Sequence, residues 1–165
     1  MLTIRPARPE DVGLIGDYIR ELADYERLSH EAEATQADLD AALFCAQPKV
    51  FCELAQWSGT PAGFALWFYT FSTFRGRHGI YLEDLYVRPG HRGHGIGRAL
   101  LATLARRCEA EKLGRLEWAV LNWNAPSIAF YERMGARPMD DWKVYRLTGE
   151  ALATLGASEE DPCSS

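Results

Sequence analysis

Arg92-Gly93-His94-Gly95-Ile96-Gly97-Arg98 lies between an apolar run, residues 80–87, and an amphipathic segment that extends to about residue 112. The apolar spacing predicts a strand before this stretch and a helix after it. A helix start leaves backbone N–H groups unpaired, and glycine lets the main chain approach a ligand closely. The stretch therefore predicts a binding site for phosphate or pyrophosphate.

Two common phosphate-binding motifs do not fit this loop. Gly90 and Gly95 have the glycine spacing of a Walker A loop, but Ile96-Gly97 stands where that motif needs lysine and a hydroxyl residue. In the dinucleotide motif G-x-G-x-x-G the third glycine would fall on Arg98 or Leu100. What remains is Arg-x-x-Gly-x-Gly. A plain strand-to-helix turn is the alternative, but it has no use for flanking arginines.

The rest of the chain alternates strand and helix patterns. We expect strands at 3–7, 50–57, 62–71, 80–87, 115–121 and 142–147, and a loop at 74–78. We expect helices from Pro9 to about residue 25, from Thr35, from Asn124 to Gly135, and a turn at 149–155. A strand–helix–strand unit gives a parallel pair and the early hairpin an antiparallel one. These patterns predict one α/β domain over residues 1–155 and a disordered tail, 156–165.

Composition excludes several classes of function. The 165 residues are 47% apolar and 25% charged, with a net charge of −5, which disfavours a nucleic-acid surface. No apolar run approaches a membrane span, and the N-terminal residues do not form a signal peptide. The four cysteines, Cys45, Cys52, Cys108 and Cys163, have the spacing of neither a metal site nor a disulfide framework. We therefore expect reduced thiols, no metal and a cytoplasmic protein.

Several motifs together resemble the GNAT family of acetyl-CoA-dependent N-acetyltransferases, especially its diamine (spermidine/spermine-type) and thialysine members. The resembling stretches are Tyr25-Glu26, Leu82 to Val87, Arg92 to Arg98, and Trp123 to Tyr131. The resemblance implies a single-domain, mostly antiparallel sheet with a splayed parallel pair and helices on both faces. It also implies acetyl-CoA as co-substrate. The implied cofactor contacts are Leu85, Tyr86, Val87, Arg92, Gly93, His94, Gly95, Ile96, Gly97, Arg98, Asn124, Pro126 and Ser127.

Glu83 and Asp84 are neighbouring acids inside an otherwise apolar strand. Acids there are costly unless they are paired or face a polar cleft. A salt bridge is one reading; the other is a cleft for an amine, with one acid as base. An alkylamine with a pKa near ~10 is protonated at neutral pH, so acyl transfer needs a proton acceptor. Glu83 is the candidate base, and Asp84, on the opposite face, a structural or substrate-binding acid.

Tyr131 follows Asn124 on a predicted helix, and by spacing alone it is a core residue. The resemblance instead implies that Tyr131 is the general acid that protonates the departing CoA thiolate. It also implies that the main chain of Leu85, Tyr86 and Val87 polarises the thioester carbonyl. Asn124 has two roles in this reading, as helix cap and as a contact to the pantetheine arm.

Further acids and aromatic residues match substrate-contacting stretches of the resembling enzymes. They are Tyr25, Glu26, Glu117, Trp118 and Asp141, with Asp140 as an alternative to Asp141. Residues 21–40 are also rich in acids, which indicates either solvated helix faces or a field that attracts a cationic substrate. The segment around Asp141 is shorter than in the animal polyamine enzymes.

The sequence thus predicts an enzyme that moves acetyl from acetyl-CoA to a primary amine of a small diamine or polyamine by direct attack in a ternary complex. Thialysine, a lysine-like amino acid or a protein terminus is the alternative acceptor. A carboxylate-binding arginine would favour an amino acid, and an all-acid cleft a diamine. A non-catalytic acyl-CoA-binding module is the third reading. The resemblance further implies a homodimer in which residues 142–147 form an edge strand.

Overall fold

The computed structural model describes residues 1–157, so most of the predicted tail lies outside the described residues. The strands are β1 (Leu2–Pro6), β2 (Phe51–Trp57), β3 (Thr60–Ser72), β4 (Arg77–Val87) and β5 (Leu116–Trp118). The helices are α1 (Val12–Tyr25), α2 (Gln36–Leu43), α3 (Ile96–Ala110), α4 (Ala125–Arg133) and α5 (Gly149–Ala157). Three short 3-10 turns are η1 (Pro9–Asp11), η2 (Ser29–Glu31) and η3 (Pro89–His91). The chain forms two compact units, Met1–Trp123 and a second that begins at Asn124.

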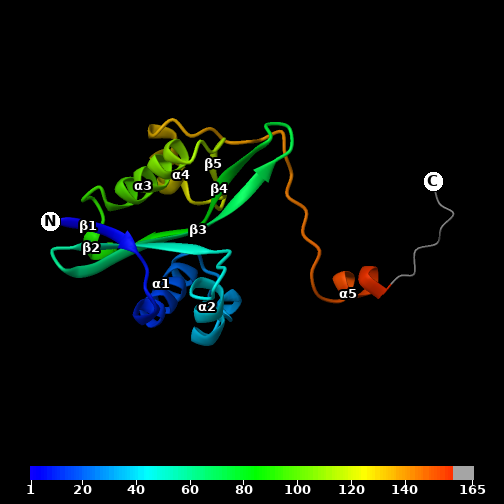
Figure 1. Cartoon of the computed structure of the whole chain (residues 1–165), viewed down its shortest axis with the longest axis horizontal. Helices are drawn as coiled ribbons and strands as arrows, with labels where there is room; N and C mark the ends of the chain where they lie inside the picture. The colour runs from blue at the N-terminus through cyan, green and yellow to red at the C-terminus, as the bar shows by residue number, and fades with distance from the viewer. Residues whose placement is uncertain (158–165) are drawn as a thin grey trace. The chain divides into compact units, whose positions relative to one another are not determined.

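The first unit is a five-stranded sheet in the order β1-β2-β3-β4-β5. Neighbouring strands are antiparallel except β4 and β5, which are parallel and joined through α3. Helices α1 and α2 lie on one face of the sheet and α3 on the other (Figure 1). This arrangement confirms the predicted mixed, mostly antiparallel α/β fold with one parallel pair.

Apolar side chains fill the space on both faces of the sheet. On the α1 side, Ile15 and Tyr18 pack on Leu54 and Phe64, and the rings of Tyr18 and Phe64 stack at 5.2 Å. On the other side, α3 buries an apolar stripe that includes Leu100 and Leu104. Each such side chain contributes about 1.5–3 kcal/mol when it leaves water. Strands β3 and β4 therefore lie between two apolar layers.

Strand β4 contains a bulge at Glu83. In the register with β3, Leu82 lies opposite Trp67 and Asp84 opposite Leu66, which leaves Glu83 as an extra residue. Residues two apart normally face the same side of a sheet. Here the bulge turns Asp84 to the α1 side with Leu66, whereas Leu82 stays on the α3 side with Trp67.

The predicted helix caps are confirmed. The Thr35 hydroxyl accepts a hydrogen bond from the Asp38 N–H at 3.2 Å, and the Asp38 carboxylate accepts one from the Thr35 N–H at 2.9 Å. Asp38 therefore takes the place that glutamate or glutamine usually holds in a capping box. Asn124 caps α4 in the same way, through its side-chain oxygen and the Ser127 N–H at 3.4 Å.

One predicted element is wrong, and two have different bounds in the structure. Residues 142–147 form no strand; Val144 and Tyr145 are 93% and 91% exposed, and no strand of their unit pairs with them within the described residues. Their alternation resembles a strand, but a strand needs a neighbour for its backbone hydrogen bonds. The predicted strand at 115–121 is limited to β5, residues 116–118, because pairing with β4 stops there. Arg77 and His78, predicted in a loop, begin β4.

Candidate functional site

The loop before α3 has the conformation that an anion site needs. Gly93 and Gly95 have φ angles of 81° and 75°, in the left-handed region that favours glycine. Gly95 is the N-cap residue of α3, and no side chain caps this helix end. Uncapped amides and the helix dipole together favour a phosphate group. The loop therefore fits the pyrophosphate-binding role predicted for Gly93, His94, Gly95, Ile96 and Gly97.

Arg92 ties this loop to its neighbours. Its Nε donates a hydrogen bond to the Val87 carbonyl at 2.9 Å. Its guanidinium lies 4.9 Å from the ring centre of Tyr25 and 5.7 Å from that of Tyr86. Cation–π contacts of this kind are worth about 0.5–1 kcal/mol at exposed sites. Arg92 thus connects the glycine loop to the end of β4 and to the end of α1.

The other flanking side chains of the loop are held differently. The ring of His94 packs on Trp57, at the end of β2, with 4.8 Å between ring centres. Trp57 was not a predicted site residue, because its contact with the loop depends on the fold. Arg98 is exposed on the first turn of α3. Of the two arginines that flank the loop, Arg92 is therefore held by protein contacts, whereas Arg98 is exposed to a ligand.

Strands β4 and β5 separate beyond Leu82. Their paired positions are Ile80 with Leu116, Tyr81 with Glu117, and Leu82 with Trp118. Strand β4 continues to Val87, but no strand of the described chain pairs with its β5 side after Leu82. This opening is the predicted splay. It makes the main chain of Leu85, Tyr86 and Val87 the predicted place for the pantetheine arm and the thioester carbonyl.

The predicted acids gather at this end of β4. Glu83 is exposed on the bulge, and Asp84 is half-buried. Burial, together with the nearby charges of Glu83 and Glu26, raises the pKa of Asp84 to about 7. Burial also raises the pKa of Glu26, at the C-terminal end of α1. The fold thus brings Glu26 to the β4 acids, where a cation would relieve the cost of charging them.

Arg27 and Trp123 contact each other beside the end of α1, and neither was predicted as a site residue. The Arg27 guanidinium lies 4.9 Å from the Trp123 ring centre, and the Tyr25 ring lies 6.2 Å from it. Arg27 has a φ of 62° because it follows the C-cap of α1, where the Leu28 N–H donates to the Ala23 carbonyl at 2.8 Å and the Arg27 N–H donates to the Asp24 carbonyl at 3.1 Å. This left-handed residue is a common way for a helix to end. The sequence carries no signal for the contact between Arg27 and Trp123 beyond the position of Arg27 next to Tyr25-Glu26.

The remaining predicted residues are less closely tied to the acids. Glu117 forms an ion pair with Arg115 on the exposed side of β5, and Trp118 is half-buried. Tyr131, Asn124, Pro126, Ser127 and Asp141 belong to the second unit. There, Pro126 lies in the first turn of α4 and the ring of Tyr131 contacts that of Phe130 at 5.4 Å. Their roles in the reaction stay predictions.

A model of the acetyltransferase (GNAT) family matches residues 18–136. The chain belongs to the GNAT acetyltransferase family. It is 35% identical to bovine thialysine N-epsilon-acetyltransferase over 163 residues, which cover 92% of this chain and 95% of that protein. It is 30% identical to human spermidine/spermine N(1)-acetyltransferase-like protein 1 over 94% of this chain and 24% of that longer protein. The predicted resemblance to both types is confirmed.

A solved structure also resembles this GNAT chain. An integron cassette protein from the mobile metagenome of V. cholerae is 28% identical to it, with a TM-score of 0.79, and the match covers 95% of this chain and 98% of that protein. GNAT acetyltransferases use acetyl-CoA as co-substrate, and the glycine loop and opened β4 edge fit such a molecule. The chain is an acetyl-CoA-dependent N-acetyltransferase.

Other features of this GNAT chain bear on the predicted exclusions. Within residues 1–157, no group of three potential metal ligands is close enough to hold an ion. In the same described part, no helix is both long and apolar enough to cross a bilayer. Cys45, Cys52 and Cys108 are free thiols.

Proposed function

We propose that this GNAT enzyme acetylates a primary amine of a small cationic molecule. The observation that carries the proposal is the acid pair Asp84 and Glu26, whose pKa values are both raised because burial disfavours their charged forms. An ammonium group beside them would favour the charged carboxylates. The proton of the substrate ammonium would then lie next to a carboxylate that can accept it.

We assign the proton transfer to the β4 acids. A base works best when its pKa is near the operating pH, and the pKa of Asp84 is about 7. Asp84 therefore accepts the ammonium proton, and Glu83, exposed on the bulge beside it, passes the proton on through water. This refines the sequence-based hypothesis, in which Glu83 alone was the base.

Acetyl-CoA supplies the activated acetyl thioester when it is bound. The residues that would hold it are those of the glycine loop, Arg92 to Arg98, the main chain of Leu85 to Val87, and Asn124, Pro126 and Ser127. We assign to Tyr131 the role of general acid, whose phenol O–H gives its proton to the departing sulfur. The amine attacks directly in a ternary complex, without a covalent enzyme intermediate.

Arg27 favours an amino acid acceptor over a diamine. Arg27 follows Glu26 directly in the chain and holds its guanidinium against Trp123. A lysine-like substrate has an α-carboxylate for Arg27 and a side-chain ammonium for the acids. A diamine has a second cation instead, which Arg27 would repel. The similarity to a thialysine acetyltransferase agrees with this reading, and a diamine remains the second candidate because of the spermidine/spermine-type relative.

The test compares acceptors that differ only in the α-carboxylate. Lysine is paired with cadaverine and ornithine with putrescine, thialysine is added, and free thiol release from acetyl-CoA is followed. We expect each amino acid to be the better substrate of its pair. Arg27→Gln should reduce that preference about tenfold, the worth of one charge-assisted hydrogen bond, whereas Arg20→Gln, on the exposed side of α1, should not.

The outcomes separate the two parts of the proposal. If diamines are preferred and Arg27→Gln changes nothing, the amino acid assignment is wrong but the cationic acceptor stands. If uncharged amines are acetylated as well as cationic ones, the role of the acid pair is wrong. No thiol release with any amine would favour a non-catalytic acyl-CoA-binding module.

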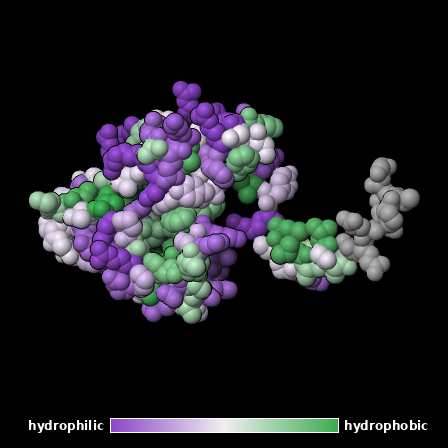
Figure 2. All heavy atoms as spheres, in the orientation of Figure 1, coloured by the Kyte–Doolittle hydropathy of each residue, from purple (hydrophilic) through white to green (hydrophobic). Residues whose placement is uncertain are grey.

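We also propose that the enzyme is a cytoplasmic homodimer with residues 1–155 as its catalytic domain. Support for a dimer comes from apolar side chains exposed in the second unit, and Figure 2 shows those of α5 as a green patch. The exposed residues are Trp142, Val144, Tyr145, Leu147 and Leu152. Val144→Asp should convert a dimer to a monomer in light scattering; a wild-type monomer would disprove the proposal.

A further inference from the structure

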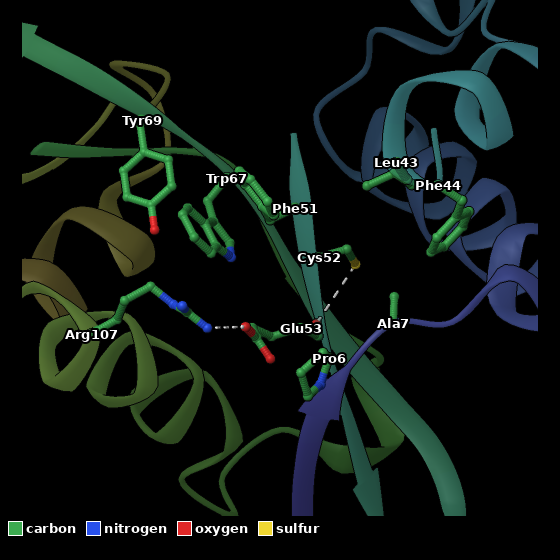
Figure 3. A pocket seen from close by; sticks show the side chains of 10 residues that line it. All are labelled: Pro6, Ala7, Leu43, Phe44, Phe51, Cys52, Glu53, Trp67, Tyr69 and Arg107. Carbon is green, nitrogen blue, oxygen red and sulfur yellow. Dashed lines mark hydrogen bonds and ion pairs between the residues drawn. The ribbon is translucent and has the colours of Figure 1, made fainter. Parts of the chain in front are cut away.

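A hollow opens at the start of β2, where β1 has already ended (Figure 3). Its volume is about 160 Å³, and it is partly open to solvent. Arg107 on its wall follows Ile96 by eleven residues of α3, which is about 16 Å along the helix axis. None of the residues assigned to acetyl transfer lines it. The hollow is therefore separate from the site at the glycine loop.

A buried carboxylate forms one wall. Glu53 is 3% exposed, and burial raises its pKa. Its ion pair with Arg107 joins Nη2 to Oε1 at 3.5 Å, longer than the ~2.7–2.9 Å of a tight charge-assisted hydrogen bond. The carboxylate therefore has acceptor capacity that Arg107 does not use.

Two buried donors lie on the same wall. The indole Nε1 of Trp67 lies near enough to the Glu53 carboxylate to lower its pKa against the effect of burial, but it makes no hydrogen bond of good geometry there. The Nε of Arg107 also has no hydrogen-bond partner among the described residues. Figure 3 shows both side chains on the same side of the hollow as Glu53. Buried N–H groups without an acceptor are costly and uncommon in folded proteins. This wall therefore places two N–H donors that lack a well-formed hydrogen bond beside the Glu53 carboxylate, whose own hydrogen bonds are incomplete.

The remaining lining is apolar and aromatic. Leu43, Phe44 and Phe51 line the hollow, and the ring of Phe51 stacks on that of Trp67 at 4.7 Å. A mostly apolar hollow with a few convergent polar groups is the usual form of a small-molecule site.

The charges limit what such a site accepts. Arg107 is shared between Glu53 and Glu111, so two carboxylates accompany one guanidinium. An anion would be repelled by the carboxylates, and a cation by the guanidinium and the two N–H groups. A neutral group that carries a hydrogen-bond acceptor beside a donor can pair with the N–H groups and with the Glu53 carboxylate at the same time.

We propose that this hollow binds an uncharged primary carboxamide carried on a small aromatic or apolar body. The amide oxygen accepts from Trp67 Nε1 and Arg107 Nε, and the amide N–H₂ donates to Glu53. The ring lies against Phe51 and Phe44. The site is a second binding site on the enzyme, and its occupation requires no acetyl transfer.

The test uses three probes of nearly equal shape: benzamide, benzoate and benzylammonium. Each is titrated into ¹⁵N-labelled full-length protein, and the indole N–H signal of Trp67, assigned with Trp67→Phe, is followed by NMR. We expect benzamide to shift this signal saturably and the two charged probes to bind at least tenfold more weakly. Saturating acetyl-CoA should leave the benzamide affinity unchanged.

Two variants and a control sharpen the result. Trp67→Phe keeps the ring but removes the donor, and should weaken benzamide about fivefold, the worth of one neutral hydrogen bond. Glu53→Gln removes the charge and should bring benzoate close to benzamide in affinity, while Trp57→Phe, outside the hollow, should change neither. An unmoved Trp67 signal with benzamide, which would mean that water alone fills the hollow, or equal binding of all three probes, would overturn the proposal.

Discussion

Asp84→Asn should stabilise the ligand-free enzyme while it removes the proposed proton acceptor. Asparagine has nearly the shape of aspartate but carries no charge. The pKa of Asp84 rises from its ordinary value of 3.8 to about 7 because the charged form is half-buried next to Glu83 and Glu26. If the folded state disfavours the ionised form of a group, the protein is less stable at every pH at which that group is ionised in the unfolded chain.

The sign and the size follow from these two pKa values. Below pH 3.8 both states hold the proton, so Asp84 costs nothing. As the pH rises from 3.8 to 7, the folded state becomes less stable by about 1.4 kcal/mol per pH unit. Above pH 7 the full cost is on the order of 4 kcal/mol, an upper bound because solvent still reaches Asp84. Asp84→Asn should recover it, raising Tm at pH 8 by up to roughly 10 °C.

Calorimetric melting of both proteins from pH 4.5 to pH 8 measures this effect. The stability gap should be small at pH 4.5 and widest at pH 8, and acetyl transfer should fall in the variant at every pH. Asp40→Asn, which changes an exposed acid on α2, is the matched control and should show no such divergence. A gap that stays constant across this range would refute the burial of Asp84 as the source of its pKa.

Three further outcomes are expected. Tyr131→Phe should lower kcat about a hundredfold, with the KM for acetyl-CoA unchanged, in steady-state kinetics; wild-type turnover would reject Tyr131 as the acid. Gly63→Ala would put a Cβ 2.4 Å from the Tyr86 carbonyl oxygen, so urea unfolding should show a loss of about 3 kcal/mol, and full stability would contradict that close approach. Arg5, bonded to the Asp11 carboxylate at 2.7 and 2.9 Å, lowers the pKa of Asp11. Asp11→Asn should therefore cost about 2 kcal/mol at pH 7, a difference that disappears as the pH falls below 3.8, where wild type loses the same stability.

Local signals account for the elements that the sequence predicted well. The glycine loop and α3, the Thr35 cap and the Asn124 cap each depend on residues within a few positions of one another. Capping and turn chemistry act over that range, so a single stretch of sequence is enough to indicate them. The resemblance added the opened β4 edge, which composition and spacing do not indicate.

The features that were not predicted depend on contacts between distant residues. The bulge at Glu83 exists only in the register with β3, and that bulge decides that Asp84 faces Leu66 and approaches Glu26. The contact between Arg27 and Trp123 joins residues far apart in the chain. In the same way, the apolar alternation of residues 142–147 carries no information about whether a partner strand is present, so it does not become a strand here.

On β4 the main chain of residues 85–87 is the proposed coenzyme contact, whereas the side chains at 83 and 84 face the acceptor. This separation has an evolutionary consequence. If the coenzyme is recognised there by peptide groups, any side chains at positions 85–87 that pack equally well preserve that recognition, whereas the charges at positions 83 and 84 decide how well a cationic amine is bound and deprotonated. Acceptor preference can then drift among descendants of this chain while coenzyme use is inherited unchanged.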